Sequence, residues 1–154
     1  MSLWLAAFLS VPAAAEFHRI DQSVAALDCA SCIGSIRTRI GRMRGVASVE
    51  VDEDARLVRV ALQPDNRVRL EAVRDVIKGV GFTPTQARVR VRGKASQNAD
   101  GWQFQPEGLD QIWRLVVAAN QQLPAGQTVV LEGIAPPVAD PRQQPVLEVT
   151  AVDP

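Results

Sequence analysis

Histidine and cysteine are scarce in this chain of 154 residues, and tyrosine is absent. His18 is the one histidine, and Cys29 and Cys32 are the only cysteines, so a cluster of many soft metal ligands is excluded. No nucleophile is accompanied by a recognisable base, and no glycine-rich phosphate loop is present. We therefore predict that the protein is not an enzyme, and nothing in it indicates an ATPase.

Net charge is also lacking, because 17 basic side chains balance 17 acidic ones. The charges are unevenly placed: residues 16–95 carry 15 basic and 10 acidic side chains, whereas residues 96–154 carry 2 and 7. This asymmetry indicates two units of opposite charge that can attract each other. Neither unit is basic enough to indicate nucleic acid as a partner. The length allows one good core or two small ones.

The apolar run within the first 15 residues is too short to span a membrane comfortably, and no later segment is long and apolar enough to do so. Leu3 to Val11 is apolar, and Ala13-Ala14-Ala15 offers a cleavage site before Glu16, which is typical of a secretory signal peptide. No Lys or Arg precedes that run, so an uncleaved anchor or a misassigned start codon are the alternatives. We expect cleavage of residues 1–15 and a periplasmic or secreted protein.

The next 80 residues show alternating and helical apolar patterns in a regular order. Alternation predicts strands at 18–27, 49–51, 58–62 and 87–92, and apolar stripes predict helices at 32–43 and 70–80. The order strand, helix, strand, strand, helix, strand predicts an α+β, ferredoxin-like βαββαβ domain over residues 16–95. Its four strands should form an antiparallel sheet with both helices on one face.

Residues 96–154 are expected to form a second, mainly-β domain. Short β-branched or aromatic runs at 102–105, 128–132 and 146–152 are separated by glycine and proline, which favours a small OB-like barrel. The run 112–119 fits a buried strand and a short helix equally well. The alternative architecture is therefore a sheet covered by one helix over residues 109–121.

The most informative motif is the pair Cys29 and Cys32, placed where the first strand gives way to the first helix. The positive end of a helix dipole favours the thiolate form, and two thiolates at this spacing can bind one soft metal ion. Thioredoxin-like redox proteins share the spacing, but Ala30-Ser31 and the lack of an aromatic residue before Cys29 argue against that interpretation. A purely structural disulfide across so short a loop would add little stability.

The order of the elements and the stretch Asp28-Cys29-Ala30-Ser31-Cys32 together resemble the heavy-metal-associated domain family, over about residues 23–91. The usual loop of that family reads G-M-x-C-x-x-C. Both cysteines are kept here, whereas Ala26 and Leu27 stand in place of the Gly-Met pair. The resemblance implies a metal-binding protein or metallochaperone whose metal ligands include both cysteines.

A second part of the resemblance is Gly81-Phe82, which matches the Gly-aromatic pair that often follows the second helix in this family. The likeness implies that Phe82 lies near the metal loop, together with Leu27, which can replace the family's methionine at small cost. The remainder of the chain has no counterpart in the usual single-domain members.

Asp28 bears on the identity of the metal. Copper(I) is stably coordinated by two thiolates alone, whereas zinc, cadmium and lead accept an oxygen ligand and prefer more than two donors. Metal-exporting ATPases for those ions resemble this chain in having Asp before the first Cys. The resemblance implies Cys29, Cys32 and Asp28 as ligands of Zn(II) or another soft divalent ion, mercury included, with Cu(I) as the alternative. Asp28 could instead serve only as a helix cap, and metal binding could have been lost.

Four arginines crowd the first predicted helix: Arg37, Arg39, Arg42 and Arg44. They form either a solvated face or a docking surface for an acidic partner, such as a membrane metal transporter or another metal-accepting protein. The expected function is capture of a metal ion and its transfer by ligand exchange. Two rival hypotheses are a thiol–disulfide oxidoreductase and an interaction module in which the second domain does the binding.

Overall fold

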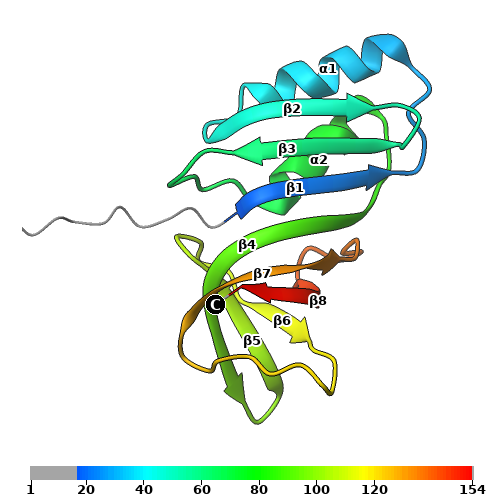
Figure 1. Ribbon diagram of the computed structural model, residues 1–154. Coiled ribbons are helices and arrows are strands. Elements are labelled where there is room, and N and C mark those ends of the chain that lie inside the picture. Colours follow the sequence, from blue (N-terminus) through cyan, green and yellow to red (C-terminus); the bar gives the residue numbers. More distant parts are fainter. Residues whose placement is uncertain (1–16, 154) are drawn as a thin grey trace, which may run out of the picture.

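The computed structural model describes residues 17–153, which form an α+β protein in two parts joined by one long strand (Figure 1). The predicted signal peptide, residues 1–15, lies outside the described residues. Within residues 17–153, no helix is long and apolar enough to cross a membrane. The elements are β1 (Phe17–Val24), α1 (Ala30–Gly41), β2 (Val46–Asp52), β3 (Leu57–Leu62), α2 (Leu70–Val80), β4 (Pro84–Asn98), β5 (Gly101–Pro106), β6 (Trp113–Val116), β7 (Thr128–Ala135) and β8 (Val146–Asp153).

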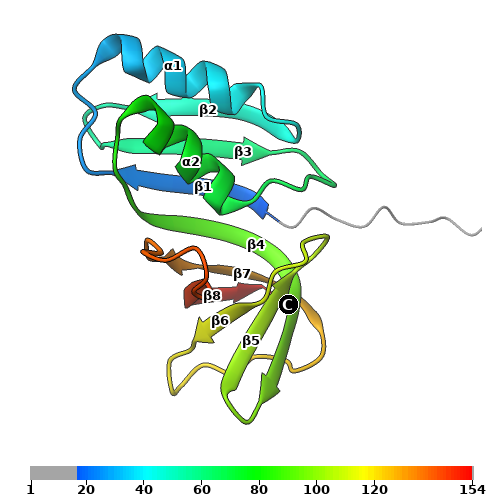
Figure 2. The same ribbon diagram turned by 180° about the vertical axis from the view of Figure 1, so that it is seen from behind.

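The first part has the predicted order of elements. Its four strands lie in the order β2-β3-β1-β4, and each neighbouring pair is antiparallel. Both helices lie on one face of this sheet, where α1 contacts β2 and α2 (Figure 2). The ferredoxin-like arrangement follows from local patterns, because each helix has an apolar stripe to bury and each strand has one apolar face.

The core of the first part comes from those stripes. The buried side chains of the helices are Ile33, Ile36 and Ile40 in α1 and Leu70, Val73 and Ile77 in α2. The helix α2 ends at Gly81, whose φ of +105° is a left-handed conformation that glycine adopts without a steric penalty. The first helix begins at Ala30, two residues before the predicted start at Cys32.

The strand β4 belongs to both parts of the molecule. It pairs with β1 from Pro84 to Val91, and further along with β5 from Gly93 to Asn98. The predicted domain boundary, between residues 95 and 96, lies inside this strand. At Gly93 a Cβ atom would lie 2.3 Å from the backbone oxygen of Gln105, so only glycine fits where the two strands approach each other.

The second part is a closed ring of five strands. The order is β4-β5-β6-β8-β7, and β7 pairs again with β4; β6 and β8 are parallel, and the other pairs are antiparallel. The ambiguous run 112–119 contains the strand β6, so the alternative of a covering helix over 109–121 is wrong. The ring encloses Phe104, Trp113, Leu131 and Leu147, all nearly inaccessible to solvent.

Besides the shared strand β4, side-chain contacts join the two parts. The ring of Phe17, at the start of β1, lies 5.9 Å from that of Trp113 in β6, so the two cores meet. Arg74 of α2 is only 4% exposed, and its guanidinium donates hydrogen bonds to the Gln22 side chain at 2.9 Å and to the carbonyl oxygens of Ala135 at 2.8 Å and Pro136 at 3.1 Å. Burial lowers the pKa of Arg74 from its ordinary value.

Candidate metal centre

The predicted metal loop connects β1 to α1 at one end of the first sheet. Leu27 is 6% exposed and anchors the loop in the core, whereas Asp28 beside it is exposed. The backbone N–H of Ala25 donates to the carbonyl oxygen of Thr83 at 2.9 Å, which places the metal loop next to the α2–β4 loop. The chain therefore holds the loop by its backbone and one apolar side chain, and leaves its polar side chains toward solvent.

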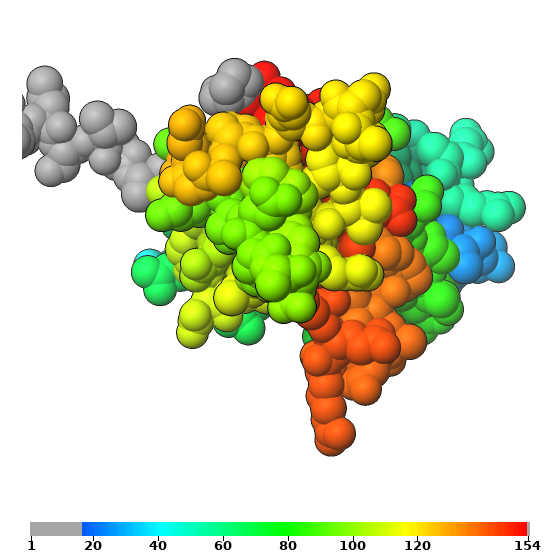
Figure 3. Space-filling view, turned by 90° about the horizontal axis from the view of Figure 1, so that it is seen from below, coloured from blue at the N-terminus to red at the C-terminus, as the bar shows by residue number. Residues whose placement is uncertain are grey.

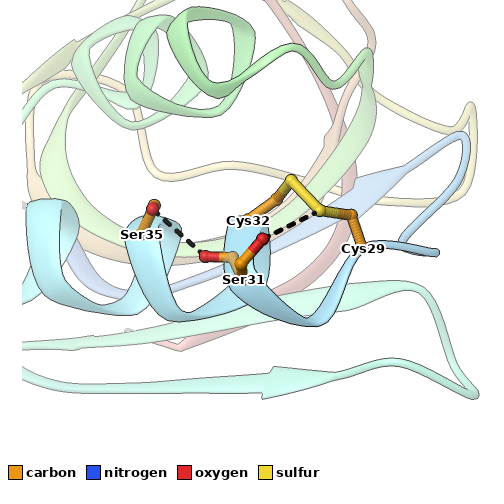
Figure 4. Close-up of a disulfide and its surroundings, with 4 residues drawn as sticks. All are labelled: Cys29, Ser31, Cys32 and Ser35. Atoms are coloured by element: carbon orange, nitrogen blue, oxygen red, sulfur yellow. Dashed lines mark hydrogen bonds between the residues drawn. A yellow bond between two sulfur atoms is a disulfide. The ribbon is translucent and has the colours of Figure 1, made fainter.

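The two cysteines lie together at the start of α1 and form a disulfide (Figure 4). Their Cα atoms are 5.2 Å apart, and both side chains are half-buried rather than sealed beneath the sheet. Cys29 occupies the N-cap position, and its carbonyl oxygen accepts the first helical hydrogen bond, from the N–H of Ile33 at 3.0 Å. Once reduced, the sulfurs would stand at the positive end of the helix dipole, which favours thiolates.

A serine hydroxyl accompanies the sulfurs. The Ser31 Oγ lies 3.4 Å from the Cys29 Sγ, and Ser35 Oγ donates to the carbonyl oxygen of Ser31 at 3.2 Å. A hydroxyl that can donate to sulfur stabilises a thiolate at that position. No motif in the sequence marks Ser31 for such a role, although any residue between two cysteines at this spacing is a candidate neighbour of one of them.

Asp28 precedes the N-cap residue of α1. No side chain caps this helix, and the N-cap position belongs to Cys29, so the alternative assignment of Asp28 as the helix cap is wrong. Among residues 17–153, no group of three His, Cys, Asp or Glu side chains is arranged to hold a metal ion. Asp28 as a third ligand beside Cys29 and Cys32 therefore stays a prediction.

Phe82 follows α2 directly and is half-buried against the common core. Its N–H donates to the carbonyl oxygen of Ile77 at 3.2 Å, which completes the end of the helix. The carbonyl oxygen of its neighbour Thr83 accepts the hydrogen bond from the N–H of Ala25 in the metal loop. The predicted closeness of the aromatic ring itself to the cysteines stays a prediction.

The four arginines of the predicted docking surface are all exposed: Arg37, Arg39, Arg42 and Arg44. Within the described part of the chain, none of the four forms an ion pair. A surface groove runs along α1 away from the disulfide, lined by Ser31, Gly34, Ser35, Thr38, Arg39 and Arg42. The hydroxyl groups of Ser31 and Ser35 thus lie near the metal loop, and the positive charge lies toward the far end of α1. The use of this face in docking stays a prediction.

The first part of the chain is similar to known proteins. Residues 23–83 match the family model of the heavy-metal-associated domain. The predicted resemblance is confirmed for this segment, which runs from β1 to the loop before β4 and includes both cysteines.

A curated relative is similar to part of this chain. The "Heavy metal-associated isoprenylated plant protein 44" of Arabidopsis thaliana is 41% identical over 56 residues, which are 36% of this chain and 31% of the relative. The chain therefore spans under a third of that relative's length.

Solved structures that are similar to this chain include a yeast copper transporter domain in apo and Cu(I)-loaded states, at 21% identity and a TM-score of 0.40. The match covers 44% of this chain and 90% of that domain. Another is the first domain of the human copper chaperone for SOD1 in its copper(I)-loaded form, at 22% identity and a TM-score of 0.38, covering 44% and 89% of the two chains.

Proposed function

We propose that this protein binds a soft metal ion at the loop that carries Cys29 and Cys32, and passes the ion to a partner. The observation that supports this most is the position of two half-buried sulfurs, close enough to bond each other, at the start of α1 within the segment that matches the heavy-metal-associated domain. The name of the plant relative, which refers to heavy metals, supports a metal-binding role as well.

Binding requires the reduced form. Two electrons and two protons from an external thiol reductant convert the Cys29–Cys32 disulfide into two thiols, and both thiols lose their protons when they bind the ion. A site with only two or three donors leaves a coordination position open. A thiolate of the partner can enter there before a resident sulfur leaves, so transfer needs no free ion at any stage.

The identity of the ion is a finer proposal. We favour Zn(II) or another soft divalent ion over Cu(I), because Asp28 is exposed next to Cys29 and offers an oxygen donor that Cu(I) does not need. Water or a partner side chain would complete a four-coordinate zinc site.

Native mass spectrometry of the mature chain tests the proposal. The reduced protein should take up one ion per chain from an equimolar mixture of Zn(II) and Cu(I), and the protein with its disulfide closed should take up none, since a disulfide has no thiolate to offer. Equal uptake by both forms, or uptake by neither, contradicts the proposal. Insulin reduction without metal uptake would favour the rival, a thiol–disulfide oxidoreductase.

The change Asp28→Asn tests the choice of metal. We expect the affinity for Zn(II) to fall by about 10- to 100-fold, which corresponds to about 1.4–2.8 kcal/mol, and that for Cu(I) to change little. Competition with chromophoric chelators measures both affinities. Asp54→Asn is the matched control, because Asp54 is exposed in the turn after β2. Equal losses for the two ions would remove the reason to prefer zinc.

The surroundings of the site suggest how the ion is delivered. The arginines of α1 would meet an acidic surface on a membrane metal transporter or another metal-accepting protein, outside the cytoplasm if residues 1–15 are removed as a signal. We also propose that the second part is an OB-like barrel that docks the partner or shields the loop. The support is its strand order, β4-β5-β6-β8-β7, with one parallel pair in an otherwise antiparallel ring.

A further inference from the structure

A cavity of about 180 Å³ lies where the two parts of the molecule meet. The helix α2 supplies one wall with Glu71, Arg74, Asp75 and Lys78, and Gln111 contributes from the segment before β6. The β7–β8 loop, which stands out from the body of the protein in orange (Figure 3), supplies the opposite wall. The remaining lining residues are mostly proline: Pro84, Pro137, Val138, Pro141, Gln143 and Pro145.

One carboxylate oxygen in this cavity lacks a partner. Glu71 Oε2 is buried and forms no hydrogen bond, whereas Glu71 Oε1 accepts only a long one, of 3.5 Å, from Gln111 Nε2. A buried carboxylate oxygen without a donor costs free energy, so this position favours a ligand that donates a hydrogen bond.

The other charged groups of the cavity are already engaged. Arg74 directs its donors to Gln22 and to backbone carbonyl oxygens of both parts of the protein, so it offers little to a ligand. Lys78 Nζ lies 3.9 Å from Asp75 Oδ1, and both side chains are exposed at 57% and 73%. The Glu71 carboxylate interacts electrostatically with the Arg74 guanidinium, but its Oε2 receives no hydrogen bond from that group or from any other residue among 17–153.

We propose that this cavity binds a primary ammonium group on a short apolar stem. Glu71 Oε2 has almost no accessible surface, so the carboxylate would turn into the cavity to accept a hydrogen bond from the ammonium. The stem would lie against the prolines of the wall, which offer apolar surface and no N–H groups. The small volume favours a short amine over a larger ligand.

A tryptophan next to the cavity provides the readout. Trp113 Nε1 donates to Gln111 Oε1 at 3.1 Å, and Gln111 lines the cavity and bonds Glu71. A cation that binds at Glu71 must perturb this chain of hydrogen bonds. The indole N–H signal of Trp113 in a ¹H–¹⁵N spectrum should therefore shift, while that of Trp102, which does not line the cavity, should stay in place.

The experiment titrates n-butylammonium chloride into the ¹⁵N-labelled mature protein with its disulfide closed, so that metal binding plays no part and its failure cannot affect the result. We expect a saturable shift of the Trp113 indole signal, and at least about tenfold weaker binding of n-butanol, because a hydrogen bond between charged partners is the stronger one. No saturable shift, or equal binding of the alcohol and the amine, would overturn the proposal.

The variant Glu71→Gln keeps the shape of the side chain and removes its charge, and it should bind n-butylammonium at least about tenfold more weakly. Glu53→Gln, in an exposed turn, is the control and should bind as the unchanged protein does. Unaltered binding by Glu71→Gln would refute the role of Glu71. If that variant does not fold, the comparison of n-butylammonium with n-butanol on the unchanged protein still tests whether the cavity binds an ammonium group.

A free amine and a lysine side chain of another protein share this chemistry. Titration with lysine blocked at its backbone amine and carboxyl groups separates the two sources. Binding as tight as that of n-butylammonium indicates a lysine of a partner protein, and much weaker binding indicates a free small amine. Both results uphold an ammonium site.

Discussion

Replacing both Cys29 and Cys32 by serine should abolish metal uptake by the mature protein. A serine hydroxyl stays protonated near neutral pH and is a poor ligand for a soft ion, so we expect the affinity to fall by more than about a thousandfold, or about 4 kcal/mol. Isothermal titration calorimetry with Zn(II), and competition with a chelator for Cu(I), measure the loss. Retention of tight binding by the double variant would show that the ion sits elsewhere.

The comparison must use the reduced protein as its reference. The disulfide closes a loop with a sequence separation of 3, and in the chain-entropy model it contributes up to about 2 kcal/mol of stability, which the variant also lacks. Ser35→Ala is the matched control, because it changes a nearby hydroxyl of α1 and keeps both sulfurs. It should bind the ion with nearly unchanged affinity.

Arg74→Met should destabilise the folded protein by about 3–5 kcal/mol. The variant keeps the length of the side chain but removes the donors that Gln22 Oε1 and the carbonyl oxygens of Ala135 and Pro136 share. The acceptors of Gln22 and Ala135 then stay buried, and that of Pro136 partly buried, without a donor. Arg74→Lys should be destabilising too, because an ammonium cannot reproduce the planar fork of donors.

Urea denaturation followed by circular dichroism measures the change for Arg74→Met. Arg37→Met on the exposed face of α1 is the control, and it should alter stability by less than about 0.5 kcal/mol. A change for Arg74→Met below about 1 kcal/mol would mean that the buried carbonyl groups find other donors, and that the guanidinium does not hold the two parts together.

Much of the first part could be predicted, because its signals are local. The apolar stripe of α1 at Ile33, Ile36 and Ile40 and the alternation in β2 and β3 each repeat within one element, so they need no knowledge of the rest of the chain. The start of α1 was harder to predict from the sequence. Cys29 stands at the N-cap in place of the usual Ser, Thr, Asp or Asn, and Asp28, the residue of that kind nearby, lies one position too early.

Other features depend on contacts between distant residues. The run around Trp113 fits a strand or a helix by its composition, and its pairing with β5 and β8 makes it a strand. Arg74 follows Leu70 and Val73 on the buried stripe of α2, so its position did mark it as facing inward. Two of its acceptors, the carbonyl oxygens of Ala135 at the end of β7 and of Pro136, lie more than 60 residues away along the chain, and no local pattern predicts them.

The sequence by itself determined that two sulfurs stand together at the start of a helix, because a spacing of three residues places them on neighbouring positions of one turn. Only the tertiary structure decided that β4 serves both parts, that Arg74 joins them, and that a cavity with an unpartnered Glu71 oxygen lies between them. The physical reason is the distance along the chain over which each feature is set. The position of the two sulfurs depends on the geometry of a single turn, whereas the shared strand, the Arg74 contacts and the cavity depend on which surfaces bury each other when the whole chain folds.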